Sequence, residues 1–376
     1  MDYQTVLARV VDDVIAPDAA AVDRYGAYPR AQLDALGQAG ILGLASSPDV
    51  GGSGHGLDAA AYVVEELARH CASTAMVVMM HFSGTAVLEA QGPRDVREAI
   101  GAGRHLTTLA FSEAGSRSHF WAPLGTATQQ NGAVRLDAQK SWVTAAGEAD
   151  SYVWSSRPIA ATGPMTLWLV PSDKPGLRVP APFDGLGLRG NASSPVMAEG
   201  VEVPASTMLG TDGAGLEIAL TVVLPWFLVL NAAASVGLMR SVTDEATAHL
   251  ARTELVHLDQ TLAQQPLSRA GLGRMRVTTD QAGALLSDAL EALAAGREDA
   301  QLRVLEVKAA AGEAAIDVTD LAMQVCGGAA FRKELGIERR FRDARAARVM
   351  APTTDALNDF IGRALCGLPL LDEVPA

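Results

Sequence analysis

The sequence predicts an α+β protein in three parts: an N-terminal α-helical domain at residues 1–105, a middle β-domain at 106–211 and a C-terminal helical bundle at 212–376. Apolar residues recur at helical spacing in the first and last parts, whereas the middle part holds short β-prone runs between turn residues. The chain is 49% hydrophobic but only 5% aromatic, so Ala, Leu and Val supply the core, and the abundance of Ala and Leu favours helices.

Four helices are predicted in the N-terminal part. Regular apolar spacing, bounded by proline or turn signals, places them at residues 31–39, 57–70, 73–90 and 93–102. A loop at residues 48–56 is rich in glycine, which adopts positive φ at little cost. We therefore expect the first domain to be helical up to about residue 105.

In the middle part, the helical spacing of apolar residues gives way to short β-prone runs. Five short runs read as strands, at residues 107–112, 125–129, 133–137, 151–155 and 165–171. Gly, Asn, Asp and Pro separate these runs and indicate turns. The β-domain is expected to close with the GLGLRG run at 185–190 and the VEVP run at 201–204.

The C-terminal part returns to the helical period. Leu302, Leu305, Ala309 and Ile316 form an apolar stripe, whereas residues 254–265 are irregular and polar and indicate a loop. Residues 218–239 carry no charge and are long enough to cross a bilayer. The run contains proline, threonine, asparagine and serine, so we interpret it as a buried bundle helix and predict no membrane span.

Charge and cysteine content narrow the function classes. The net charge of −13 argues against a sequence-independent binder of DNA or RNA, so no nucleic-acid partner is expected. Cys71, Cys326 and Cys366 are far apart and lack the spacing of a zinc ribbon, so no metal site is predicted. The first residues show no secretory signal pattern. A reducing, cytoplasmic location is the expectation.

Several motifs occur in a fixed order along nearly the whole chain. They are GILGL at 40–44, GGSG at 51–54, EELA at 65–68, LAFSEAGS at 109–116, KSWVT at 140–144, QVCGG at 324–328 and RD at 342–343. Together they resemble the acyl-CoA dehydrogenase family of flavoproteins. The resemblance implies an N-terminal α-helical domain, a middle β-barrel or sandwich, and a C-terminal four-helix bundle. It also implies FAD as the cofactor.

The resemblance assigns flavin contacts to residues of the β-domain. Phe111, Ser112, Gly115 and Ser116 lie in the flavin-binding entry, where Ser112 resembles the residue on the pyrimidine edge and Ser116 the one at the pyrophosphate. Backbone amides exposed at a glycine suit a phosphate group. The assignment continues on the strand motif with Trp142, which packs on the flavin, and Thr144, which donates to it. An ordinary strand tryptophan and a surface threonine are the alternative.

Further contacts are assigned to the C-terminal part. Gln324 with Gly327 and Gly328 resembles the turn that holds the adenine end of FAD from a neighbouring subunit, although a simple helix C-cap is the alternative. Thr353 and Asp355 match polar positions of the family's last motif. The family polarises a thioester carbonyl with a backbone amide, and the resemblance points to the amide of Ala351.

The main departure from the family is the loss of its base. A Glu-Gly-Thr turn normally supplies the Glu that removes the substrate's α-proton, and Ala351 and Pro352 replace Glu and Gly here. Relatives that lack this Glu place the base on an earlier helix, but residues 224–228 read LPWFL. Such a base contributes roughly 10²–10⁴-fold to the rate. Ordinary α,β-dehydrogenation is therefore expected to be disabled unless another base has moved in.

Two further departures concern the flavin site. The family's Arg-x-x-Phe-Gly clamp reads RTELVH at 252–257, so Arg252 is offset by one position and Val256 replaces Phe. The loop at 112–116 is two residues shorter than usual and is followed by His119. His119 is a candidate acid or base, because an imidazole side chain can accept or donate a proton near neutral pH, and a surface histidine is the alternative. Glu113 is predicted to be structural.

Three hypotheses follow. The first is a repurposed flavoenzyme, an oxygenase or oxidase of secondary metabolism, that acts on a CoA or carrier-protein thioester. The second is ordinary dehydrogenation with a relocated base, either His119 or Asp355. The third is an inactive subunit beside an active paralogue. A homodimer or homotetramer is expected from the resemblance, with an electron-acceptor flavoprotein or O₂ as oxidant.

Overall fold

The computed structural model describes residues 2–116 and 119–371. The N-terminal part is helical, as predicted, and a single turn of π-helix at Val11–Ile15 joins its first two α-helices. The helices are α1 (Tyr3–Val10), α2 (Ala16–Tyr25), α3 (Arg30–Gln38), α4 (Leu57–His70), α5 (Ala72–Gln91) and α6 (Arg94–Gly101). The last four match the predicted ranges to within a residue at each end. Helix α5 is buried over most of its length because its residues are apolar or small on all sides.

The middle part forms two four-stranded sheets. One sheet has the order β1-β4-β5-β8 and the other β2-β3-β7-β6. The strands are β1 (Thr107–Ala110), β2 (Thr126–Gln130), β3 (Ala133–Val143), β4 (Ser151–Ser156), β5 (Thr166–Pro171), β6 (Leu177–Arg178), β7 (Ser194–Pro204) and β8 (Met208–Leu209). Strands β3 and β7 are longer than predicted. They pair with each other through two bulges, which disturb the alternation that the sequence pattern relies on.

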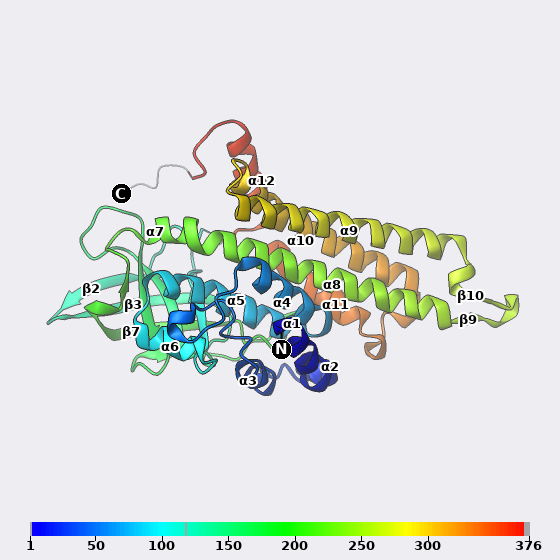
Figure 1. The fold of residues 1–376 in the computed structure, drawn as a ribbon, viewed down its shortest axis with the longest axis horizontal. Coiled ribbons are helices and arrows are strands. Elements are labelled where there is room, and N and C mark those ends of the chain that lie inside the picture. Colours follow the sequence, from blue (N-terminus) through cyan, green and yellow to red (C-terminus); the bar gives the residue numbers. More distant parts are fainter. Residues whose placement is uncertain (1, 117–118, 372–376) are drawn as a thin grey trace.

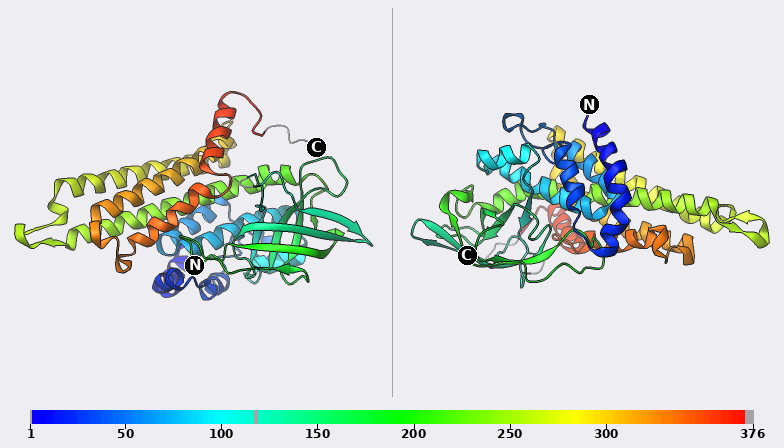
Figure 2. Two further views of the ribbon diagram at one scale, coloured as in Figure 1. Left: turned by 180° about the vertical axis from the view of Figure 1, so that it is seen from behind. Right: turned by 90° about the horizontal axis from the view of Figure 1, so that it is seen from below.

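The C-terminal part is a set of long helices that pack on one another. They are α7 (Gly215–Ile218), α8 (Leu224–Arg252), α9 (Pro266–Ala295), α10 (Ala300–Cys326), α11 (Ile337–Val349) and α12 (Thr354–Leu365). Helix α8 contacts α9, α10 and α11, and α10 contacts α9, α11 and α12. The predicted loop at 254–265 is a small hairpin, β9 (Glu254–Leu255) with β10 (Gln260–Thr261). Figure 1 shows this hairpin and the sheets at opposite ends of the molecule, and both views of Figure 2 agree.

Helix α8 is the centre of the helical core. The uncharged run falls in a continuous helical stretch, Gly215–Arg252, that is long and apolar enough to cross a membrane. Within its most apolar 18-residue segment, however, 78% of the residues are buried inside the fold. This burial agrees with the prediction of a bundle helix. Gly237 lets α8 approach α4 closely, because a Cβ at this position would lie 2.1 Å from the carbonyl oxygen of Glu65.

Two motifs that are far apart in sequence meet where the β-domain joins the bundle. The Leu188 N–H donates to Asp343 Oδ1 at 2.6 Å, and Arg342 donates to the carbonyl of Leu186 at 3.1 Å. A Cβ on Gly187 would lie 2.5 Å from the carbonyl oxygen of Arg342, so only glycine fits there. Arg342 also pairs with Asp23 of α2 at 2.7 Å. The GLGLRG and Arg-Asp motifs therefore fasten the three parts together.

His81 links α5 to β1 and gives the fold a predictable response to acid. Its Nδ1 accepts from the Thr107 N–H at 3.2 Å, so the hydrogen is on Nε2, which donates to the Leu42 carbonyl at 3.0 Å. Burial lowers the pKa of His81 from 6.5 to about 4. The unfolded chain binds this proton more readily, so stability is lost as the pH falls from 6.5 towards 4.

At about 1.4 kcal/mol per pKa unit, the loss attributable to His81 reaches about 3 kcal/mol. We expect His81→Gln to remove this part of the acid dependence. Urea unfolding of both proteins at about pH 7 and about pH 4 measures it. Equal acid-induced losses in the two proteins would show that His81 is not the titrating group.

Candidate active site

The loop that follows β1 lies along β3. The Ser141 N–H donates to the carbonyl of Ser112 at 2.9 Å, and the Ala114 N–H donates to the carbonyl of Gln139 at 3.0 Å. Phe111, just before this loop, is buried. These backbone bonds place Ser112 beside the strand that carries Trp142, so the structure brings together two of the motifs assigned to the flavin.

Glu113 fixes this loop from inside. Its Oε1 lies 2.5 Å from Lys140 Nζ, and its Oε2 accepts from the N–H groups of Leu124 and Gly125 at 2.6 and 2.8 Å. Lys140 also donates to the carbonyl and the hydroxyl of Ser155. Both side chains of the pair are fully buried. The prediction that Glu113 is structural is confirmed by these bonds.

Trp142 and Thr144 present different surfaces at the end of β3. The Trp142 side chain is 71% exposed although the residue sits in a strand, and its φ of +56° is unusual for a bulky residue. Its nearest ring is Phe183, at 6.5 Å and nearly perpendicular. Thr144 is buried, and its hydroxyl lies 3.1 Å from the hydroxyl of Ser193. The indole face is therefore free to receive a flat apolar ring.

These residues fit the FAD that the family resemblance implies. Among the described residues, the Ser112 hydroxyl has no hydrogen-bond partner. The Ser116 hydroxyl donates to the carbonyl of Glu113, which leaves its lone pairs available. Gly115 has a φ of +94° and is exposed, which suits backbone approach to a phosphate. An exposed aromatic face, the unpaired hydroxyl of Ser112 and the exposed backbone at Gly115 are a set of groups that suits a flavin ring with a phosphate chain.

We expect Trp142→Ala to weaken FAD binding by about tenfold or more, because the indole offers a large flat apolar surface. Because the side chain is mostly exposed, the free energy of unfolding of the flavin-free protein should change by less than about 0.5 kcal/mol. Equilibrium dialysis measures the flavin affinity. Val277→Ala, an exposed apolar residue on α9, is the control and should leave that affinity unchanged. Unaltered flavin binding by Trp142→Ala would remove Trp142 from the site.

The turn between α11 and α12 contains Ala351, the residue to which the resemblance assigns the position of the family's base. Ala351 is half-buried, and among the described residues no carbonyl or side chain accepts from its N–H. Thr353 caps α12, with its hydroxyl accepting from the Ala356 N–H at 3.3 Å. The backbone donor that the resemblance assigns to Ala351 is therefore available in the structure.

The buried side chain of Lys308 hydrogen-bonds to the backbone of this turn. Its Nζ donates to the carbonyls of Met350 and Pro352 at 2.9 and 2.6 Å, and it is completely buried. Burial lowers the pKa of Lys308 from 10.5 to about 7. The sequence analysis missed this residue, although a lone lysine within the apolar stripe of α10 was a signal. Its two bonds fix the carbonyls on both sides of Ala351.

The second base position is also apolar in the structure. Residues 224–228 form the first turn of α8, where Phe227 is 8% exposed and Leu228 is fully buried. The two candidates for a relocated base lie at the surface. His119 is exposed and stacks on Trp121 at 4.9 Å, and Asp355 is exposed in the first turn of α12. Trp121 packs on Phe360 of α12 at 5.5 Å, so these two candidates lie on neighbouring segments.

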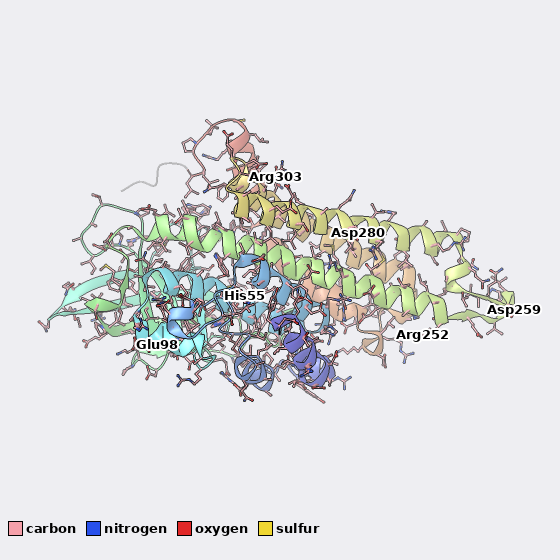
Figure 3. The ribbon with its side chains drawn as sticks, in the orientation of Figure 1. His55, Glu98, Arg252, Asp259, Asp280 and Arg303 are labelled. Atoms are coloured by element: carbon pink, nitrogen blue, oxygen red, sulfur yellow. The ribbon has the colours of Figure 1, made fainter. Side chains whose placement is uncertain are left out.

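The remaining assigned residues lie away from the β-domain. Arg252 ends α8, and Gln324, Gly327 and Gly328 surround the end of α10; all four are exposed. Figure 3 labels Arg252 beside the hairpin of β9 and β10, at the end of the bundle farthest from the sheets. Within one chain the structure does not bring these residues to Trp142.

Comparisons with known proteins agree with this architecture. Models of the acyl-CoA dehydrogenase N-terminal, middle and C-terminal domains match residues 2–101, 108–201 and 213–366. The cyclohex-1-ene-1-carbonyl-CoA dehydrogenase of Geobacter metallireducens is 28% identical over 359 residues, which cover 93% of each chain.

Three solved structures have the same fold. Butyryl-CoA dehydrogenase from Megasphaera elsdenii has a TM-score of 0.91 at 22% identity, with 97% of each chain covered. The prolyl acyl carrier protein oxidase AnaB has a TM-score of 0.87 at 20% identity, covering 96% of this chain and 98% of that one. An FAD complex of PigA has a TM-score of 0.88 at 21% identity, covering 97% and 96%. With all three domain models matched, the chain belongs to the acyl-CoA dehydrogenase family of FAD-dependent oxidoreductases.

Proposed function

We propose that this protein is a flavin-dependent oxidoreductase that acts on an acyl thioester of CoA or of a carrier protein, with oxygen-using chemistry in place of base-catalysed α,β-dehydrogenation. One observation carries the proposal. Neither Ala351 nor residues 224–228 offer a carboxylate. The N–H of Ala351 is nevertheless unpaired among the described residues, and Lys308 holds the carbonyls on both sides of it.

The chain's own residues support the binding part of this proposal. FAD, when bound, supplies the capacity to exchange electrons with a substrate and with O₂. Trp142 offers an exposed ring surface, and Ser112 on the adjacent loop offers a hydroxyl, while Thr144 is buried with its hydroxyl against that of Ser193. The N–H of Ala351 is free to polarise a thioester carbonyl, and Lys308 holds the turn that carries it.

The apolar character of the second base window also favours oxygen chemistry. Residues 224–228, where a second base is expected, hold no carboxylate, and Phe227 and Leu228 among them are buried. An apolar wall excludes water, which limits side reactions of a reactive intermediate. AnaB is a prolyl acyl carrier protein oxidase, so this fold accommodates both a carrier-protein substrate and an oxidase function.

The test is a turnover experiment with the purified, flavin-loaded protein. We expect NADH with a flavin reductase, isotopically labelled O₂ and an acyl thioester to give a product that carries the label, as seen by mass spectrometry. Reduction of the bound flavin by saturated acyl thioesters would instead establish dehydrogenation with a relocated base, such as His119 or Asp355. Failure to bind flavin would leave the inactive-subunit hypothesis.

We also propose a homo-oligomer located in the cytoplasm. Arg252 lies at the opposite end of the molecule from the sheets, one strand of which, β3, carries Trp142, so a second copy is needed to bring both residues to one FAD (Figures 1 and 3). Val256 is 85% exposed on the hairpin beside Arg252, and Phe331 is 83% exposed after α10. Light scattering of the flavin-loaded protein measures the assembly, and a monomer would contradict it.

A further inference from the structure

A small, partly open cavity lies where α5, α8, α10 and α11 meet. Its volume is about 30 Å³, and alanines from α8, α10 and α11 line much of it. About 10–15 Å³ suffices for one water molecule, so the cavity can hold a small polar group but not an extended alkyl chain. Three polar side chains reach it, those of Asn231, Ser235 and Asp343.

Asn231 is the unusual member of this lining. It is 2% exposed, and its Nδ2 contacts the sulfur of Met350 at 3.7 Å. Its Oδ1 is buried without a hydrogen-bond partner among the described residues. Buried amide oxygens in native proteins are nearly always paired with protein, water or ligand. Asn231 therefore presents an open acceptor at the cavity.

The other two polar side chains at the cavity, those of Ser235 and Asp343, offer no free hydrogen-bond donor. The Ser235 hydroxyl donates to the main-chain carbonyl of Asn231 at 3.0 Å, so its hydrogen is used. Asp343 is buried and accepts from the Leu188 N–H at 2.6 Å. A carboxylate is an acceptor with several lone pairs. The cavity thus collects acceptors, and a group that donates hydrogen bonds complements it.

The cavity is also close to the reacting end of the site. Asn231 touches Met350, and Met350 directly precedes Ala351, whose free N–H is the proposed contact of the thioester carbonyl. Ala346 and Ala347, in the last turns of α11, border the cavity on the same side. Met350 therefore links Asn231 to the position of the proposed carbonyl contact.

We infer that this cavity is the acyl subsite and that Asn231 Oδ1 accepts a hydrogen bond from the acyl group. The substrate is then a short acyl thioester with a hydroxyl or amine N–H on its chain, not a plain saturated fatty acyl group. This inference rests on the proposed thioester function and names its substrate class. Asn231 is a specificity-determining residue.

The experiment uses pairs of phosphopantetheine thioethers, which lack the carbonyl and cannot react. The two members of a pair have equal chain length and differ only in a terminal methyl or hydroxyl group. Calorimetric titration of the flavin-loaded protein should show the hydroxyl member binding about tenfold more tightly at one chain length or more. In Asn231→Leu, which keeps the branching and the number of side-chain heavy atoms but removes the acceptor, this preference should disappear.

Thr243→Val is the matched control. Its hydroxyl is buried on the same helix and donates to the Met239 carbonyl at 2.8 Å, away from the cavity. This variant should retain the preference for the hydroxyl member. If wild-type protein binds both members of every pair equally, or prefers the methyl member, the inference is wrong and the thioester function stands. If no thioether binds, the inference is wrong as well, while the thioester function, whose carbonyl contact at Ala351 these probes lack, is judged by the turnover experiment with true thioesters.

Discussion

The double variant Ala351→Glu/Pro352→Gly is expected to dehydrogenate a saturated acyl thioester about 10²–10⁴-fold faster than the wild type. It restores the Glu-Gly-Thr turn typical of the family, with Thr353 already in place. Lys308 holds the carbonyls on both sides of Ala351, so the backbone that would present the new carboxylate is already fixed. A positioned base is the one component that the turn lacks.

Anaerobic mixing of the flavin-loaded variant with a saturated acyl thioester measures this gain as bleaching of the flavin's visible absorbance. Ala351→Gln/Pro352→Gly is the matched control, because it adds the same volume without a base and should bleach no faster than wild type. If the Glu variant binds flavin and thioester but gains no more than the Gln variant, the absent carboxylate is not what limits dehydrogenation.

Lys140→Met is expected to lower the free energy of unfolding by about 3–5 kcal/mol, the usual result of removing one partner from a buried ion pair. The variant leaves the carboxylate of Glu113 buried with only the N–H groups of Leu124 and Gly125 as donors. Burial lowers the pKa of Lys140 to about 8, and Glu113 opposes that decrease. The loop at 112–116, to which we assign the flavin, should loosen when the pair is broken, because Glu113 lies within it.

Urea unfolding measures the loss. Arg135→Met is the control on the same strand: its pair with Asp137 is 2.8 Å long but 46% and 38% exposed, and exposed pairs contribute less than about 1 kcal/mol. The second variant Lys140→Met/Glu113→Leu should recover much of the lost stability, since it removes the unpaired charge. A Lys140→Met loss no larger than that of Arg135→Met would contradict the account of the loop.

Much of the fold was predictable because its helices have regular apolar spacing. Residues 57–70 were predicted as a helix with the bounds that the structure gives α4. The full lengths of β3 and β7 were not predictable, because bulges interrupt their pairing and β3 continues through the polar residues Gln139 to Ser141. The pattern of apolar and polar residues along one strand carries no information about how that strand pairs with its neighbour.

The site was predictable only where motifs mark it. Ser112 and Trp142 were named from motifs, and the backbone bond from Ser141 to Ser112 places them together. Lys308 and Asn231 were missed as site residues because their roles depend on contacts with Met350, which lies more than forty residues away in sequence. Each was visible only as a polar residue in an apolar helix, a signal that does not reveal its partner.

The most direct test of the central claim is the absorbance of the wild-type, flavin-loaded protein after anaerobic mixing with saturated acyl thioesters. The claim is that the FAD scaffold is retained while base-dependent dehydrogenation is lost. The visible absorbance of the wild-type flavin should therefore not bleach with thioesters of any chain length, under conditions in which the flavin of Ala351→Glu/Pro352→Gly does. Rapid bleaching of the wild-type flavin would contradict the claim and show that a base acts from elsewhere.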